Sequence, residues 1–255
     1  MNLRIITKSL ISEDSNIIVG VSDGAQIWAD TPWPLIPTTE KASKHAAIYI
    51  AKEMTYTHNC MLQGLNSIYH QAENVRQYEE IADFLFFVKC WTGWVSRHHI
   101  MEEEMMSPGF EKLKTLQDYS AQTQPLNFDA SIIRNFIEEM GPTFRDHLGD
   151  EIDSLLRMIH YNSKALKVYK SCVAEVAKQD KFPMVLGLRD VTFESGNQRP
   201  SLPPMADWII NYLLARKHAG AWRFLPCDGW GKPRSLVFGL KPEGKEKENT
   251  DNKKE

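Results

Sequence analysis

The sequence lacks the features of secreted, membrane-spanning and nucleic-acid-binding chains. Its four cysteines, Cys60, Cys90, Cys172 and Cys227, are widely spaced and form neither a dense disulfide framework nor a CxxC metal pair. No apolar run approaches the ~20 residues of a membrane span, and the first residues lack the apolar core of a signal peptide. With 30 Lys+Arg against 33 Asp+Glu, the formal charge of −3 argues against a surface for nucleic-acid phosphates. We therefore expect a cytoplasmic protein with neither nucleic acid nor a membrane as a partner.

Two common catalytic motifs are also missing. The chain has no Gly-rich phosphate loop and no GxSxG nucleophile elbow. Cys60 follows His58 by two residues, which would place the two side chains ~200° apart around a helix. A Cys/His catalytic pair is therefore not expected.

What is present is helical periodicity. Of the 255 residues, 42% are hydrophobic, and in four segments the apolar residues recur at spacings of three and four. These segments span about 40–72, 76–106, 110–122 and 127–161. Thr38 and Thr39 are candidate N-caps of the first helix, as are Asn127 and Asp129 of the fourth. Helices joined by short loops predict an all-α fold, an antiparallel four-helix bundle.

The bundle accounts for about half of the chain. We expect an irregular N-terminal arm over 1–40, with a candidate strand at 16–21, and the bundle over 41–162. A C-terminal extension over 163–240 would hold helices at 163–178 and 205–218 on either side of an irregular, Gly- and Pro-rich stretch. The polar tail, 241–255, has no large apolar residue and is expected to be disordered. Gly141-Pro142 is predicted to kink or interrupt the fourth helix.

Histidine and glutamate recur four residues apart in two of these helices. The pairs are His99 with Glu103 and His147 with Glu151, and each shares a helix face with apolar residues. His58 lies on the apolar face of the first helix. An unpaired charge in a core costs several kcal/mol, so these groups need compensation. A shared divalent ion such as Fe, Mn or Zn would satisfy all of them.

Other interpretations of the same pattern stay open. A single inward histidine is more often a hydrogen-bonded core residue than a ligand, and a His-x3-Glu pair can be a surface pair. His98 and Glu102 form an overlapping pair rotated by ~100°, so we expect one pair to face the core and the other its flank. His99 is preferred because the apolar face passes through Val95. The remaining histidines, interpreted as structural or surface residues, are His45, His70, His160 and His218.

Three ordered motifs resemble those of the hemerythrin-like (HHE) cation-binding domain. They are MTYTHN at 54–59, HHIMEE at 98–103 and HLGDEI at 147–152, and the resemblance covers roughly 42–162. It implies a four-helix bundle that holds non-haem iron, as one or two ions, and binds O₂ or a related small ligand. The segments 30–37 and 222–228 resemble extensions of a longer subgroup of that family.

Carried over residue by residue, the resemblance assigns five metal ligands. His58 matches the first-helix ligand, and His99 and Glu103 match the pair of the second helix, with Glu103 as a bridging carboxylate. His147 and Glu151 match the fourth-helix pair. Iron is the favoured metal, with zinc or manganese as alternatives.

The sequence departs from the family at the third helix, where the family usually places histidine. No histidine occurs between His99 and His147. Five ligands suffice for one metal ion, but a second ion would be under-coordinated unless Glu102, Glu111 or water completes it. A mononuclear or non-iron site is therefore one expectation.

Two other functions stay open beside small-ligand binding. The first is a metal-dependent oxidoreductase acting on a small organic substrate, and the second is a non-catalytic bundle with a degenerate metal site. In the enzyme, the extension would line a substrate pocket, although its aromatic residues are also expected simply to pack on the bundle. The candidate lining residues are Asp190, Glu194, Trp208, Trp222 and Arg223.

Overall fold

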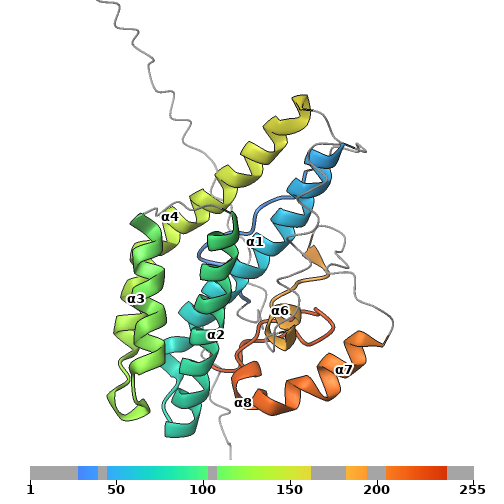
Figure 1. The fold of residues 1–255 in the computed structure, drawn as a ribbon. Coiled ribbons are helices and arrows are strands. Elements are labelled where there is room, and N and C mark those ends of the chain that lie inside the picture. Colours follow the sequence, from blue (N-terminus) through green and yellow to red (C-terminus); the bar gives the residue numbers. More distant parts are fainter. Residues whose placement is uncertain (1–27, 40–44, 103–107, 162–181, 194–204, 240–255) are drawn as a thin grey trace, which may run out of the picture.

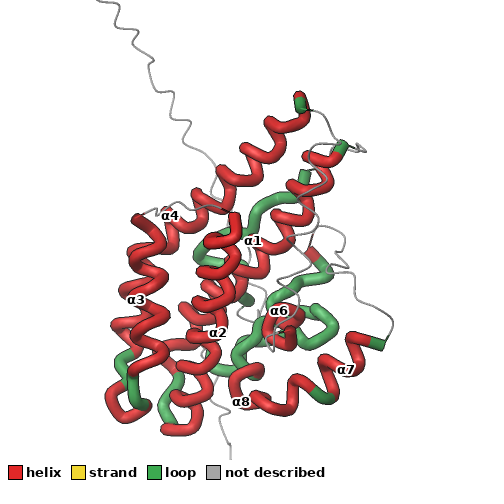
Figure 2. The backbone as a smooth tube through the Cα atoms, viewed as in Figure 1, coloured by secondary structure: helices red, strands yellow, loops and turns green. Residues whose placement is uncertain are grey.

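The computed structural model describes residues 28–39, 45–102, 108–161, 182–193 and 205–239, which form helices and loops without a strand (Figures 1 and 2). The α-helices are α1 (Ala46–Gln71), α2 (Tyr78–Glu102), α3 (Pro108–Gln122), α4 (Ala130–Arg157), α6 (Phe182–Gly187), α7 (Ala206–Tyr212) and α8 (Ala219–Trp222). The 3₁₀ turns are η1 (Ala72–Asn74), η2 (Pro125–Asn127), η3 (Met158–His160) and η6 (Leu214–His218). Over the described residues the fold is all-α, as the periodicity predicts.

The start of α4 agrees with the prediction, whereas the start of α1 does not. Asp129 caps α4, its side chain accepting a hydrogen bond from the Ser131 amide. Neither Thr38 nor Thr39 begins a helix; α1 begins at Ala46, and the His45 side chain is its N-cap. Thr38 and Thr39 belong to the segment that runs along α1, and the N-cap position of that helix is occupied by His45 instead.

The structure corrects three other local predictions. Of the kink or interruption expected at Gly141-Pro142, the interruption does not occur, because Pro142 is exposed and solvent can hydrogen-bond the carbonyl that its missing N–H leaves free. The helix expected over 205–218 ends at Tyr212 and continues as the 3₁₀ turn η6. The stretch expected to be irregular contains α6.

The four long helices pack around one core. α1 lies along α4 and α2 lies along α3, while α3 also contacts α4 and α2 contacts α1 (Figure 1). The core side chains come from all four helices and include Leu65, Trp91, Leu116 and Ile137, each with no more than 1% of its surface exposed. Within the part of the chain that the structure describes, no helix is both long and apolar enough to cross a membrane.

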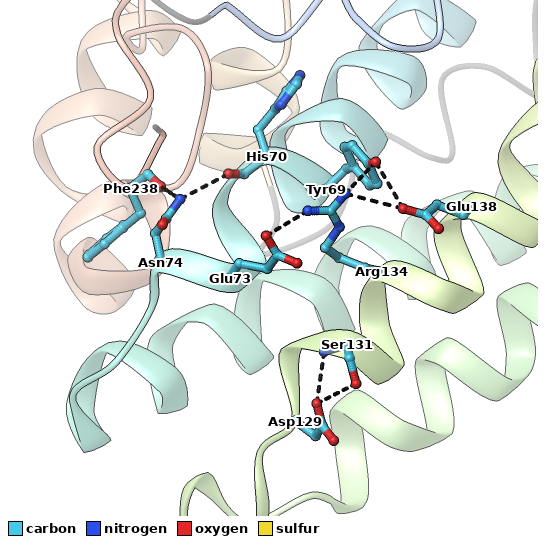
Figure 3. A network of polar contacts seen from close by, with 9 residues as sticks. All are labelled: Tyr69, His70, Glu73, Asn74, Asp129, Ser131, Arg134, Glu138 and Phe238. Carbon is cyan, nitrogen blue, oxygen red and sulfur yellow. Dashed lines mark hydrogen bonds and ion pairs between the residues drawn. The ribbon is translucent and has the colours of Figure 1, made fainter. Parts of the chain in front are cut away.

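A polar network fixes α1 against α4 at the surface (Figure 3). The Arg134 guanidinium of α4 lies over the Tyr69 ring of α1, 4.2 Å from its centre. Arg134 also pairs with Glu73 at 2.7 Å, and the Tyr69 hydroxyl donates to Glu138 at 2.9 Å. These contacts join the two helices that carry most of the candidate site.

The described part of the N-terminal arm, 28–39, is irregular and is held by two buried amides of α1. The Asn59 side chain accepts from the Ile36 amide at 2.7 Å and donates to the Ile36 carbonyl at 2.9 Å. Asn66, two helical turns later, does the same for Trp33 at 3.1 and 2.8 Å. The candidate strand at 16–21, the helix at 163–178 and the tail at 241–255 lie outside the described residues.

The C-terminal segment enters the core beside α2. The Phe224 ring is fully buried, with its centre 5.1 Å from the Phe84 ring and 6.2 Å from the Phe87 ring. Its carbonyl accepts hydrogen bonds from the Ser67 hydroxyl and the Gln71 amide of α1. This segment is therefore part of the same core as the long helices.

Candidate metal centre

Three helices bring histidine and carboxylate side chains to one place. Glu151 of α4 lies between two imidazoles: its Oε2 is 3.2 Å from Nε2 of His58 in α1, and its Oε1 is 3.1 Å from Nε2 of His147. Ligand atoms of His99 in α2, His147 and Glu151 lie within 4.8 Å of one another. The structure therefore brings together four of the five residues singled out in the sequence. Glu103, the fifth, lies outside the described residues.

The orientation of two of the rings suits a cation. Nδ1 of His58 donates to the Leu148 carbonyl at 3.0 Å, and Nδ1 of His99 donates to the Val95 carbonyl at 2.9 Å. In a neutral imidazole, a proton on Nδ1 leaves only a lone pair on Nε2. Nε2 of His58 then faces a carboxylate oxygen of Glu151. Both atoms are hydrogen-bond acceptors, so a proton or a metal ion must lie between them. Anchoring the second ring nitrogen on a carbonyl is also the usual arrangement of a metal-bound histidine.

The electrostatics favour the metal-binding protonation states of two of these residues, His99 and Glu151. Burial, reinforced by the neighbouring His98, lowers the pKa of His99 to about 4. Burial alone would raise the pKa of Glu151, but hydrogen bonds and positive charge from His147 and His58 outweigh it and hold that pKa below its usual range. At neutral pH, His99 is therefore neutral and Glu151 is ionised, as metal ligands must be.

His98 belongs to the same group, contrary to the expectation that one of the two adjacent histidines lies on a flank. His98 and His99 are 8% and 7% exposed. The His98 ring centre is 5.5 Å from that of His58 and 5.3 Å from that of His99. The end of α2 is enclosed on two sides, so two positions ~100° apart are both buried. The signal available in the sequence is the pair of adjacent histidines near the end of the second predicted helix.

Aromatic side chains close the inner side of the site, and α4 leaves the outer side partly open. The Phe144 ring centre is 6.0 Å from that of His99 and 6.2 Å from that of the fully buried Trp91. In contrast, 27% of the His147 side chain and 21% of the Glu151 side chain are exposed. A small molecule would therefore approach from the α4 side.

The residues considered for a substrate pocket are not gathered at this site. Trp222 is buried beside Phe86, and Arg223 pairs with Asp83 of α2 at 3.2 Å. Trp208 lies on the surface, 58% exposed. The other two are Asp190, which lines a small cavity with Cys60 and Gln63, and Glu194, which lies outside the described residues.

Three of the four histidines set aside in the sequence have structural contacts. His45 caps α1, and His70 hydrogen-bonds the Thr31 carbonyl. The His218 ring stacks on Phe86, with centres 4.3 Å apart. Burial raises the pKa of the Cys60 thiol to about 12, so it is not a nucleophile at neutral pH.

Over the described residues, the fold and this site define an all-helical protein with a partly buried histidine–carboxylate group able to hold a metal ion. The chain is 31% identical over 243 residues to the dimeric xanthone biosynthesis cluster protein R11 of Cryptosporiopsis sp. (strain 8999). The alignment covers 83% of this chain and 93% of the Cryptosporiopsis protein, and the chain belongs to the same family. No family profile matches the sequence, and no solved structure matches it.

Proposed function

We propose that the chain is a hemerythrin-like metal-binding protein, a four-helix bundle that holds non-haem iron and binds O₂ or a related small ligand. The observation that carries the proposal is the arrangement around Glu151, whose two carboxylate oxygens face Nε2 of His58 and of His147 at 3.2 and 3.1 Å. Two ligands at ~90° around one ion with bonds of ~2.1 Å would lie ~3 Å apart, so this spacing fits a shared ion.

Two imidazole nitrogens, from His99 and His147, and the Glu151 carboxylate lie close enough together to share one ion, and His58 faces the other oxygen of that carboxylate. Imidazole and carboxylate donors suit iron, manganese or zinc. The buried His98 adds a fourth imidazole on α2, although α3 carries no histidine. This additional donor supports a second ion, for which the sequence motifs alone offered too few ligands.

The described residues would bind and orient the ion and limit access to it. The carbonyls of Leu148 and Val95 hold two imidazoles with Nε2 turned inward, and ionised Glu151 supplies negative charge. Phe144 and Trp91 exclude water from the inner side. A bound non-haem iron would supply an open coordination position for O₂ or a related ligand.

Elemental analysis and the near-UV spectrum of the purified protein test the proposal. We expect one or two iron ions per chain, with oxo-bridge absorption if there are two. His147→Ala should lose most of the iron, whereas His160→Ala, a change at an exposed histidine of η3, should keep it. A purified wild-type protein that neither contains nor takes up iron, manganese or zinc would contradict the proposal.

A second candidate is a metal-dependent oxidoreductase acting on a small organic substrate. The name of the Cryptosporiopsis relative, which refers to the biosynthesis of a dimeric xanthone, favours it. The test is to incubate the iron-loaded protein with xanthone-type aromatic compounds and O₂ and to follow O₂ consumption and products by mass spectrometry. Reversible O₂ binding without consumption supports the binding protein. Product formation that His147→Ala abolishes supports the enzyme.

A further inference from the structure

A groove of about 610 Å³ lies between the N-terminal arm and α4, and we call it the α4 groove. Ile36 of the arm and Ile152 of α4 line it and are buried, and Leu156 adds a half-buried apolar side chain. Gly149 also lines the groove and has no side chain to fill it. The volume is typical of small-molecule sites, which span ~300–1,000 Å³.

The side chains that line the α4 groove leave it with a net negative charge. Asp146, Asp150 and Asp153 line it and are exposed, and none of the three forms an ion pair within the part of the chain that the structure describes. Arg145 lines it as well, and its Nε donates to the Pro34 carbonyl at 2.7 Å, which holds the arm against α4. A ligand that fits this groove therefore carries more than one positive charge together with an apolar part.

The three carboxylates are spread along α4 and are not gathered around one point. Residues four and three apart in a helix lie ~6 and ~4.5 Å apart along its axis, and these are the separations of Asp146 from Asp150 and of Asp150 from Asp153. Among the described residues, the histidine–carboxylate group of the candidate metal centre has three ligand atoms within 4.8 Å of one another, and the aspartates do not. They therefore suit a ligand whose charges are themselves spread out, and not a single metal ion.

We propose that the α4 groove binds a linear polyamine of the spermidine type. Such a molecule carries three ammonium groups joined by three and by four methylenes, and with bonds of ~1.5 Å its extended chain separates them by ~5 and ~6 Å. These distances match those along α4, so each ammonium faces one of the three carboxylates. The methylenes lie over Ile152 and Leu156 and remove apolar surface from water.

The α4 groove is separate from the candidate metal centre. Successive side chains of a helix point ~100° apart, so Asp146 and His147 project from different sides of α4. Polyamine binding in the groove is thus a second property of the chain. It does not depend on whether the histidines hold iron.

Isothermal titration calorimetry of the full chain with spermidine tests the proposal. At ~0.15 M ionic strength, which screens exposed charges, we expect one saturable site per chain. Putrescine, which has two ammonium groups, and Mg²⁺, which has no apolar part, should each bind about tenfold more weakly. Asp146→Asn with Asp150→Asn should weaken spermidine binding by about tenfold. Asp118→Asn with Glu79→Gln removes two exposed carboxylates elsewhere and should leave binding unaltered.

Gly149→Leu distinguishes a fitted groove from general attraction between charges. The new side chain fills the groove without changing the charge of the protein, so spermidine binding should be lost. Circular dichroism shows whether this variant is folded; should it not fold, the aspartate variants and the comparison of spermidine with Mg²⁺ decide the question.

Three results would overturn the proposal. The first is the absence of saturable binding up to ~1 mM spermidine. The second is equal affinity for spermidine and Mg²⁺, or an unchanged affinity in the double aspartate variant. The third is a wild-type dimer, seen by light scattering, that Gly149→Leu converts to a monomer, because a second copy of the chain would then occupy the groove.

Discussion

At the scale of single residues, Glu151 is the group on which the proposed metal site depends. Each of its oxygens faces a different imidazole, and those imidazoles come from α1 and α4. Because its pKa is held low, it carries a full negative charge in the metal-free protein at neutral pH. This charge offsets that of a bound cation.

Replacing Glu151 by glutamine tests this role. The side chain keeps its size but loses its charge. An amide NH₂ group, which does not bind metal, replaces one of the two carboxylate oxygens. We expect metal content, measured by elemental analysis after loading with iron, to fall by about tenfold or more. Glu139→Gln, which changes an exposed carboxylate of the same helix, should leave it unaltered. Equal metal content in the two variants would contradict the assignment.

Cys227 predicts a loss of stability at alkaline pH. Its thiol is buried, and burial together with the nearby Asp190 raises its pKa far above the usual range. In the unfolded chain the thiol ionises near ~8.5, while the folded protein keeps its proton. The free energy of unfolding should therefore fall by about 1.4 kcal/mol per pH unit above that value from this thiol. Denaturant titrations between pH 7 and pH ~10 measure the slope, and Cys227→Ala should make it shallower. An unchanged slope would exclude Cys227 as its source.

At the scale of elements, Gly64 sets how closely α2 approaches α1. A Cβ at this position would lie 2.3 Å from Cδ1 and Nε1 of Trp91, whose ring is fully buried and donates to the Met61 carbonyl. No larger residue fits there unless the two helices separate. The wall of the histidine site that Trp91 and Phe144 form depends on this contact.

Gly64→Ala should destabilise the protein by about 2–3 kcal/mol, because the added methyl overpacks a rigid ring. Gly149→Ala in α4 is the matched control. Its Cβ would meet only the flexible end of Arg145 at 3.0 Å, so the helix should gain about 0.5–1 kcal/mol. Urea denaturation of both variants provides the comparison. An unchanged free energy of unfolding in Gly64→Ala would show that the two helices can separate without a loss of stability.

The positions of the helices show which features of the fold the local sequence predicts. The apolar repeat placed the four long helices, and Asp129 marked the start of α4, since both signals act within one or two turns. The start of α1 was wrong because residues 28–39 are held by Asn59 and Asn66, contacts between distant parts of the chain. His98 was misplaced for a related reason: a helical repeat assigns one buried face, whereas neighbouring helices enclose the end of α2 on two sides.

At the scale of the whole molecule, a shared ion would join three helices that are distant in sequence. Since the ligands converge only in the folded chain, metal binding should stabilise the fold by RT ln(1 + [M]/Kd). Chelation should therefore lower Tm, by several degrees if the loss is about 2 kcal/mol. Calorimetry with and without chelator measures it, and Glu151→Gln, already depleted of metal, should show little response. An equal shift in that variant would place the stabilising ion elsewhere.

The burial of Phe224 has a consequence for inheritance. Its ring fills a gap beside Phe84 and Phe87, and its carbonyl is held by Ser67 and Gln71. The long helices and the C-terminal segment therefore cannot be exchanged between genes independently. A recombination that transferred the helices alone would yield an open hydrophobic core, so descent should preserve the two together even where the histidines change.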